Sequence, residues 1–146
     1  MTRGALWSLV LWGGALVAPP AFAWQPPEGV PPMSIALEGG SVRLRLEEGW
    51  KTYGPDPGPY GYPPVVSAVE SSNVASWSLD WPVALPQESF GVPFSGYARD
   101  VAIPLSVEPL DPNLPARLVL SWDVAACARV CVPVSGTVVW RARPSP

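Results

Sequence analysis

The residues of this chain best suited to chemistry are two cysteines, Cys127 and Cys131, which are separated by three residues. In a straight strand, residues four apart lie about 13 Å from each other, whereas a disulfide needs Cα atoms about 4.4–6.8 Å apart. If the two cysteines pair, the residues between them must form a tight turn, either at a hairpin tip or at a local kink. Such a turn would place the pair near the surface.

Spacing alone leaves three roles open for the pair. A structural disulfide is the usual role of cysteines in exported domains, but closing so short a loop contributes only roughly 2 kcal/mol. Thiol–disulfide exchange needs a resolving thiol beside the attacking one, and Arg129 between the cysteines favours a thiolate electrostatically. Two thiolates also suit Cu(I), although Met33 is the only other sulfur beyond the first residue.

The composition excludes several other function classes. Histidine is absent, which removes Ser–His and Cys–His nucleophile pairs and every histidine metal ligand. A closed zinc site needs four ligands, so two cysteines do not make one and we expect no metal. The 9 basic and 12 acidic residues give a net charge of -3, which provides no basic surface for nucleic acid. Eight tryptophans predict a packed core despite 21 prolines and 13 glycines.

The first 23 residues have the pattern of a signal peptide. Arg3 precedes an apolar run over 5–18, and Ala21-Phe22-Ala23 has the form of a signal peptidase site. The apolar run is shorter than the roughly 18 to 20 residues that span a bilayer. We therefore expect cleavage after Ala23, a Pro-rich extended segment over 24–33, and an exported, soluble protein in a compartment where disulfides can form.

The elements that must position the cysteines are predicted to be strands. Apolar and polar residues alternate with period two over 42–46, 101–107, 117–124 and 137–141. Weaker strand patterns occupy 35–38, 65–69 and 74–79. Because proline cannot donate a ladder hydrogen bond, Pro104 predicts that its strand lies at a sheet edge or carries a bulge.

Helices have little room in this sequence. Prolines recur throughout the chain after Pro55, and each costs about 3 kcal/mol inside a helix. Short strands separated by Pro/Gly turns are typical of a β-sandwich. The sequence therefore predicts one all-β domain over 34–143, with no internal repeat.

A set of short motifs resembles a known family. The motifs occur in this order: Gly49-Trp50-Lys51-Thr52-Tyr53, Pro57-Gly58, Trp81-Pro82, Phe90-Gly91, Gly96-Tyr97 and Cys127-x-x-x-Cys131-Val132-Pro133. Together they are similar to the periplasmic N-terminal domain of DsbD-type thiol:disulfide interchange proteins, in the variety with three residues between its cysteines. The resemblance implies an immunoglobulin-like β-sandwich, in agreement with the strand pattern.

The resemblance also implies a function. Such a domain receives reducing equivalents from a membrane-embedded cysteine pair and passes them to periplasmic thioredoxin-like proteins, including isomerases and cytochrome c maturation factors. By this resemblance, Cys131 forms the mixed disulfide with partners and Cys127 resolves it. The domain would be a monomeric redox carrier of the protein-disulfide reductase type. It needs no cofactor, because the disulfide itself carries two electrons.

Further site residues follow from the same resemblance. The segment 87–91 corresponds to a cap over the cysteines, with Phe90 as its aromatic residue and Glu88 as its carboxylate. Tyr53 matches an aromatic position beside the pair. The plain alternatives are core or turn aromatics for Phe90 and Tyr53, and a solvated carboxylate for Glu88. The acidic residue that often follows the Cys-Pro element is absent, because Val134-Ser135 stands there.

Two other functions compete with the redox carrier. One is a non-catalytic periplasmic binding or assembly module with a structural disulfide, and the other is a Cu(I)-handling protein. A structural bridge has a reduction potential below about -300 mV, and an exchanging one has a higher potential. The aromatic loop Tyr60-Gly61-Tyr62-Pro63-Pro64 is either an exposed partner contact or a turn packed over the sandwich edge, and the second interpretation is favoured.

Overall fold

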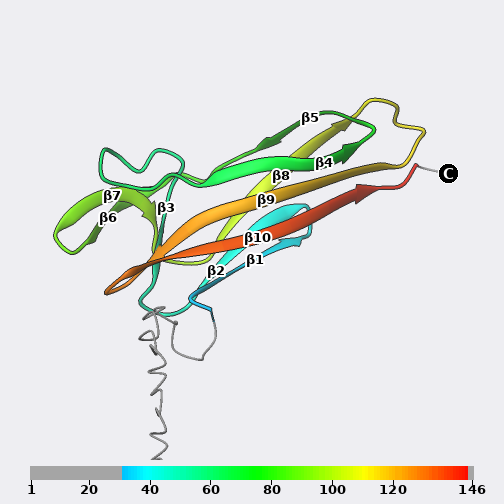
Figure 1. Ribbon diagram of the computed structural model, residues 1–146. Coiled ribbons are helices and arrows are strands. Elements are labelled where there is room, and N and C mark those ends of the chain that lie inside the picture. Colours follow the sequence, from blue (N-terminus) through cyan, green and yellow to red (C-terminus); the bar gives the residue numbers. More distant parts are fainter. Residues whose placement is uncertain (1–30, 145–146) are drawn as a thin grey trace, which may run out of the picture.

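The fold is a sandwich of two antiparallel sheets. The computed structural model describes residues 31–144, and within them the chain forms ten strands and no helix (Figure 1). The first sheet has the order β1 (Met33–Glu38), β2 (Ser41–Leu46), β8 (Val101–Pro109) and β5 (Val74–Leu79). The second has the order β10 (Cys131–Ala142), β9 (Ala116–Cys127), β3 (Lys51–Tyr53), β7 (Val92–Tyr97) and β6 (Leu85–Ser89), and β4 (Val65–Ser72) also pairs with β9. The predicted all-β, immunoglobulin-like sandwich is confirmed.

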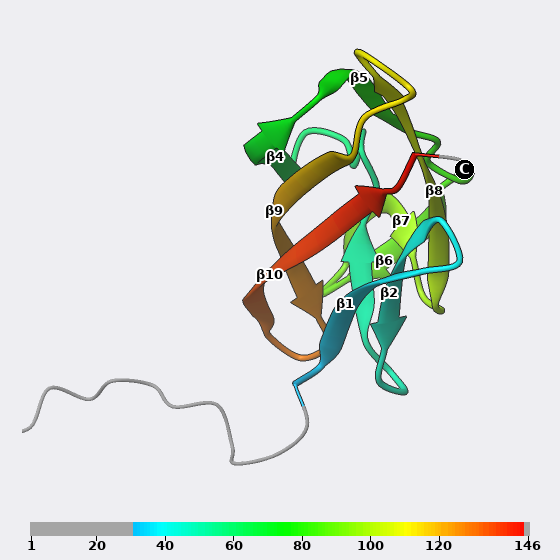
Figure 2. The same cartoon turned by 90° about the vertical axis from the view of Figure 1, so that its right-hand side faces the viewer.

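The core lies between the sheets, where the alternating apolar residues meet. Leu44 of β2 and Ile103 of β8 face Leu120 and Trp122 of β9, and all four side chains are fully buried. The Trp122 ring lies 5.8 Å from that of Trp81. Figure 2 shows the two layers from the end of the molecule. Burial of one face of each strand is the physical reason for the period of two in the sequence.

The predicted strands all form, and three more join them. The additional strands are β3, β6 and β7. Pro86 and Pro93 lie in the β6–β7 hairpin, and Gly96 ends the alternation of β7. Because proline and glycine are depleted in strands, period-two alternation of apolar and polar residues does not identify such segments as strands. Of these unpredicted strands, β3 pairs directly with Cys127, and β7 and β6 follow it in the sheet.

The prediction that the strand of Pro104 lies at a sheet edge is wrong, because β8 is an interior strand, and the register shift in the β5–β8 ladder falls at Val74 and Ser76, away from Pro104. It lies between β2 and β5, and Pro104 pairs with Ser41 of β2. On its other side, the last ladder pair with β5 is Leu79 with Leu105, after which the Asp80 N–H donates to the Pro104 carbonyl oxygen at 2.9 Å. The missing N–H therefore falls where the β5 ladder ends, and neither a sheet edge nor a bulge is needed there.

One long hairpin carries the cysteines. β9 and β10 pair without a register shift from Cys127 with Cys131 to Ala116 with Ala142. On its other side, β9 has two partner strands: β4 pairs with 117–123, and β3 pairs with Ala126 and Cys127. This arrangement makes β9 a central strand and leaves β10 at the edge of the sheet.

The N-terminal predictions fall mostly outside the described residues. The predicted signal peptide over 1–23, its cleavage after Ala23, and most of the 24–33 segment precede residue 31. β1 begins at Met33, which is buried in the core. Over residues 31–144, there is no helix long and apolar enough to cross a membrane.

Candidate redox site

The two cysteines form a disulfide at the tip of the β9–β10 hairpin. They are the first paired residues of the hairpin, with Cα atoms 4.0 Å apart, and residues 128–130 form the turn between them. The expectation that a pair with this spacing requires a tight turn is confirmed. No cysteine in the described residues is left free.

The two sulfur-bearing residues differ in exposure. Cys127 is only 1% exposed, because β3 covers it by pairing Lys51 with it. Cys131 is exposed, because it begins β10, the outer strand of its sheet among residues 31–144. Exchange chemistry depends on access to the sulfur that is attacked. Only Cys131 offers that access in this disulfide form.

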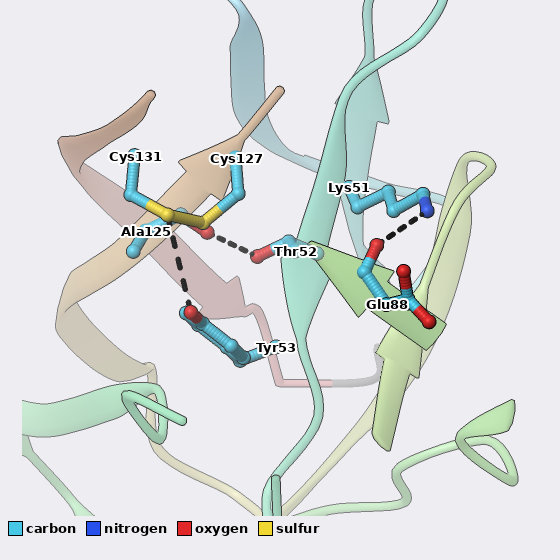
Figure 3. The surroundings of a disulfide bond; sticks show 7 residues. All are labelled: Lys51, Thr52, Tyr53, Glu88, Ala125, Cys127 and Cys131. Atoms are coloured by element: carbon cyan, nitrogen blue, oxygen red, sulfur yellow. Dashed lines mark hydrogen bonds between the residues drawn. A yellow bond between two sulfur atoms is a disulfide. The ribbon is translucent and has the colours of Figure 1, made fainter. Parts of the chain in front are cut away.

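Tyr53 lies directly beside the exposed cysteine. Its hydroxyl oxygen is 3.9 Å from the Cys131 sulfur (Figure 3). The Tyr53 ring packs edge-on against Phe94 of β7, with ring centroids 4.7 Å apart. The structure thus brings the predicted aromatic residue to the disulfide and holds its ring on the neighbouring strand.

Thr52 is a structural residue of the site that the sequence did not single out. Its side chain is 1% exposed, and its hydroxyl donates to the Ala125 carbonyl oxygen at 2.8 Å (Figure 3). On its other side, Thr52 pairs with Tyr97, whose hydroxyl donates to the Pro82 carbonyl oxygen and whose pKa is raised by burial. In the sequence, the only feature that points to Thr52 is its place between Lys51 and Tyr53 in the quoted motif.

The predicted cap residues lie at the tip of the β6–β7 hairpin. Phe90 and Gly91 both have positive φ angles, 53° and 74°, as a tight two-residue hairpin turn requires. Phe90 is 66% exposed, so it is not a core aromatic. The Lys51 ammonium donates to the Glu88 carbonyl oxygen at 2.8 Å, which ties this hairpin to β3 (Figure 3).

Two concave regions flank the disulfide. The first, here called the Cys131 groove, has a volume of about 470 Å³ and is lined by residues that include Tyr53, Tyr62, Asp123, Cys131, Pro133 and Ser135. The second, here called the Cys127 pocket, has a volume of about 350 Å³ and is lined by residues that include Lys51, Glu88, Ser89, Phe90, Cys127 and Arg129. The cap residues therefore adjoin Cys127, whereas Tyr53 adjoins Cys131.

An acidic residue enters the Cys131 groove from an unexpected place. Asp123 of β9 pairs with Ser135 of β10, and the Ser135 hydroxyl donates to the Asp123 carboxylate at 2.6 Å. The family resemblance predicts an acid directly after the Cys-Pro element, but Val134-Ser135 stands there. The facing strand supplies one instead. Only the hairpin register reveals this placement.

The aromatic loop after β3 is exposed, contrary to the favoured interpretation. Tyr60 is 76% and Tyr62 57% exposed. The loop does pack at Gly61, where an added Cβ would collide with the Pro57 ring. The side chain of Tyr62 instead forms a wall of the Cys131 groove.

Comparison with known proteins identifies the family. The model of the family described as "Thiol:disulfide interchange protein DsbD, N-terminal" matches residues 20–141. The chain belongs to this family. The match covers the β-sandwich from β1 to Arg141 in β10 and includes both cysteines, so the disulfide lies within the DsbD N-terminal family match.

One solved structure agrees with this fold. The N-terminal periplasmic domain of ScsB from Proteus mirabilis superposes with a TM-score of 0.56 at 21% identity, over 73% of this chain and 43% of that one. The DsbD N-terminal domain of Neisseria meningitidis in the reduced form gives a TM-score of 0.46 at 16% identity, over 78% of this chain and 95% of that one. Among curated proteins, no relative matches.

Within residues 31–144, no group of three or more acidic, cysteine or histidine side chains is arranged to hold a metal ion. The chemistry available at the site is that of the disulfide and its reduced dithiol. The chain belongs to a family of thiol–disulfide exchange modules, and the exposed Cys131 sulfur is placed where such exchange can occur.

Proposed function

We propose that this domain carries two electrons in the periplasm, from a membrane-embedded cysteine pair to thioredoxin-like proteins. The reduced domain begins the transfer when the Cys131 thiolate attacks the disulfide of an oxidised partner. A Cys131–partner disulfide forms and one partner thiolate leaves. The Cys127 thiolate then attacks the Cys131 sulfur, which closes the Cys127–Cys131 disulfide and releases the second partner thiolate. The partner gains the two electrons that the domain loses, and the membrane donor restores the dithiol.

The unequal exposure of the two cysteines supports these roles. A sulfur that meets partners must be accessible, as Cys131 is, whereas a resolving sulfur has only to reach Cys131. Cys127 is 1% exposed and lies on the strand that β3 and β10 enclose. The periplasmic location rests on the predicted signal peptide and on the similarity to the periplasmic domain of ScsB.

Trapping of the mixed disulfide tests the proposal. Removal of the resolving thiol stops the reaction after its first step, so Cys127→Ser should accumulate a reducible adduct with a thioredoxin-like partner. The adduct is detected by non-reducing electrophoresis, and mass spectrometry locates its bond at Cys131. Cys131→Ser is the matched control and should accumulate no adduct.

Two results would overturn this function. The first is an absence of adduct from both variants. The second is a wild-type disulfide that resists millimolar glutathione, which is the behaviour of a structural bridge.

A further inference from the structure

The geometry of resolution determines which side of the disulfide a partner occupies. Attack on a sulfur proceeds with the entering and leaving sulfurs on opposite sides, nearly in line. When Cys127 attacks Cys131, the partner sulfur must therefore lie beyond Cys131, on the side away from Cys127. Cys131 lines the Cys131 groove and Cys127 does not. The partner chain next to its reacting cysteine is therefore placed at this groove.

The groove has one charged side chain. Of the described residues that line it, Asp123 alone carries a formal charge, and the others are apolar, aromatic or neutral polar residues. Asp123 lies four residues before Cys127 on β9, which corresponds to about 13 Å along the strand. A carboxylate has two acceptor oxygens, and the bond from Ser135 holds the Asp123 side chain in place. This carboxylate presents a fixed negative charge at the end of the groove remote from the disulfide.

The opposite side of the disulfide has a different charge. The Cys127 pocket contains the cations of Lys51 and Arg129 and one carboxylate, that of Glu88. A partner segment over the disulfide would meet an acidic groove beyond Cys131 and a net basic pocket beside Cys127. Complementary charge guides encounter and favours one orientation over the other.

We propose that the Cys131 groove selects an extended partner segment with a basic side chain a few residues from its reacting cysteine, and that Asp123 is the selecting group. This inference rests on the proposed function and adds the chemistry of the partner. The aromatic walls formed by Tyr53 and Tyr62 contact the segment between its cysteine and its basic residue. The face is well suited to such a segment, because Tyr62 is exposed and aromatic side chains provide large contact area at low entropic cost.

The test compares two disulfide peptides that differ only in the sign of the charge on one residue, which each homodisulfide carries twice. The probes are the homodisulfides of Cys-Gly-Gly-Lys and Cys-Gly-Gly-Glu, both acetylated and amidated so that only the last side chain is charged. Each is reacted with the reduced full-length protein at low salt, and the rate of peptide thiol release is measured. The ratio of the two rates cancels the thiolate fraction and the nucleophilicity of Cys131, since the same thiolate attacks both.

Neutralising Asp123 should remove the preference for the basic peptide. We expect Asp123→Asn to lower the Lys-to-Glu rate ratio about fourfold, the size of a unit-charge interaction at about 10 Å in water acting with opposite signs on the two probes. The ratio should approach one in 1 M salt, where the Debye length is about 3 Å. Asp123→Glu should keep the preference because it keeps the charge.

A matched control separates the groove from overall charge. Glu108→Gln removes one carboxylate from β8, in the other sheet, and should leave the ratio unchanged. An unchanged ratio in Asp123→Asn, or an equal fall in Glu108→Gln, would overturn the assignment of the groove. If reduced wild-type protein reacts with neither peptide, the proposed function itself fails. Equal rates with both peptides would reject only the role of Asp123.

Discussion

The two cysteines are the same residue type, but their surroundings on the two sides of the disulfide differ. Cys127 belongs to a central strand and is covered by β3, so its position depends on backbone pairing. Cys131 begins an edge strand and is exposed, and the Tyr53 hydroxyl lies 3.9 Å from its sulfur. One covalent bond thus joins a fixed sulfur to an accessible one. Strand order is sufficient to explain this difference in exposure, and no difference in residue type is needed.

The largest effect is expected from disrupting the pairing of β3 with β7, on the Cys127 side of the disulfide. Gly96 pairs with Tyr53, and a Cβ at this position would overlap the Thr52 carbonyl oxygen and lie 2.9 Å from the Phe94 ring. Because the obstructing atom belongs to the backbone, β3 and β7 would have to separate. Gly96→Ala should lower the free energy of unfolding by about 3 kcal/mol, as measured by urea denaturation.

Gly136→Ala is the control for this change. A Cβ there would meet only the Ile35 side chain, at 3.1 Å, and that side chain can shift. Its cost in unfolding free energy should be clearly smaller. Equal losses of unfolding free energy in the two variants would contradict the importance of the β3–β7 contact on the Cys127 side.

A smaller effect is expected from opening the Cys127 pocket. Phe90 lines this pocket and not the Cys131 groove. Phe90→Ala should therefore speed the reaction of reduced Cys127 with a small alkylating reagent several-fold, because a shield over a thiol limits access. The measurement uses the Cys131→Ser background, in which Cys127 is the only thiol.

The control for this prediction is the effect of the same substitution on the other cysteine. In the Cys127→Ser background, Phe90→Ala should leave alkylation of Cys131 nearly unchanged, and Phe90→Leu should largely preserve shielding of Cys127. Equal acceleration at both cysteines would mean that the β6–β7 hairpin covers the whole disulfide and that the two sides are not independent.

The smallest effect is expected at the exposed side. In the reduced protein, the Tyr53 hydroxyl is placed to donate to the Cys131 thiolate, since it lies 3.9 Å from that sulfur in the disulfide form. Loss of a weak hydrogen bond reduces the thiolate population, while the remaining thiolate becomes more nucleophilic and offsets part of the loss. Tyr53→Phe should slow alkylation of Cys131 in the Cys127→Ser background about twofold at neutral pH.

Tyr60→Phe is the matched control, because it removes the hydroxyl of an exposed tyrosine in the neighbouring loop. It should not change the rate. The unfolding free energy of Tyr53→Phe should equal that of the parent variant, since the ring still packs on Phe94. A large loss of stability would assign Tyr53 a structural role in place of a chemical one.

Local sequence rules determined most of the scaffold. Period-two alternation predicted the β2, β8, β9 and β10 strands, because one face of each must be buried in the sandwich. The spacing of Cys127 and Cys131 required a turn, since the distance between sulfur-bearing residues is a local constraint. The motif order also indicated the family, to which the chain belongs.

The motifs indicated Tyr53 and the segment 87–91 beside the cysteines, and only the tertiary structure decided what else surrounds the sulfurs. Asp123 lies in the Cys131 groove because of the register of the β9–β10 hairpin. Tyr62, from the loop between β3 and β4, lines the same groove. Pro104 could not be placed from its own properties, because the end of β5 depends on pairing between distant segments. Residue type and local spacing do not show that Cys127 is buried and Cys131 exposed. Their difference comes from which strand is central and which lies at the edge, and sheet packing alone sets that order.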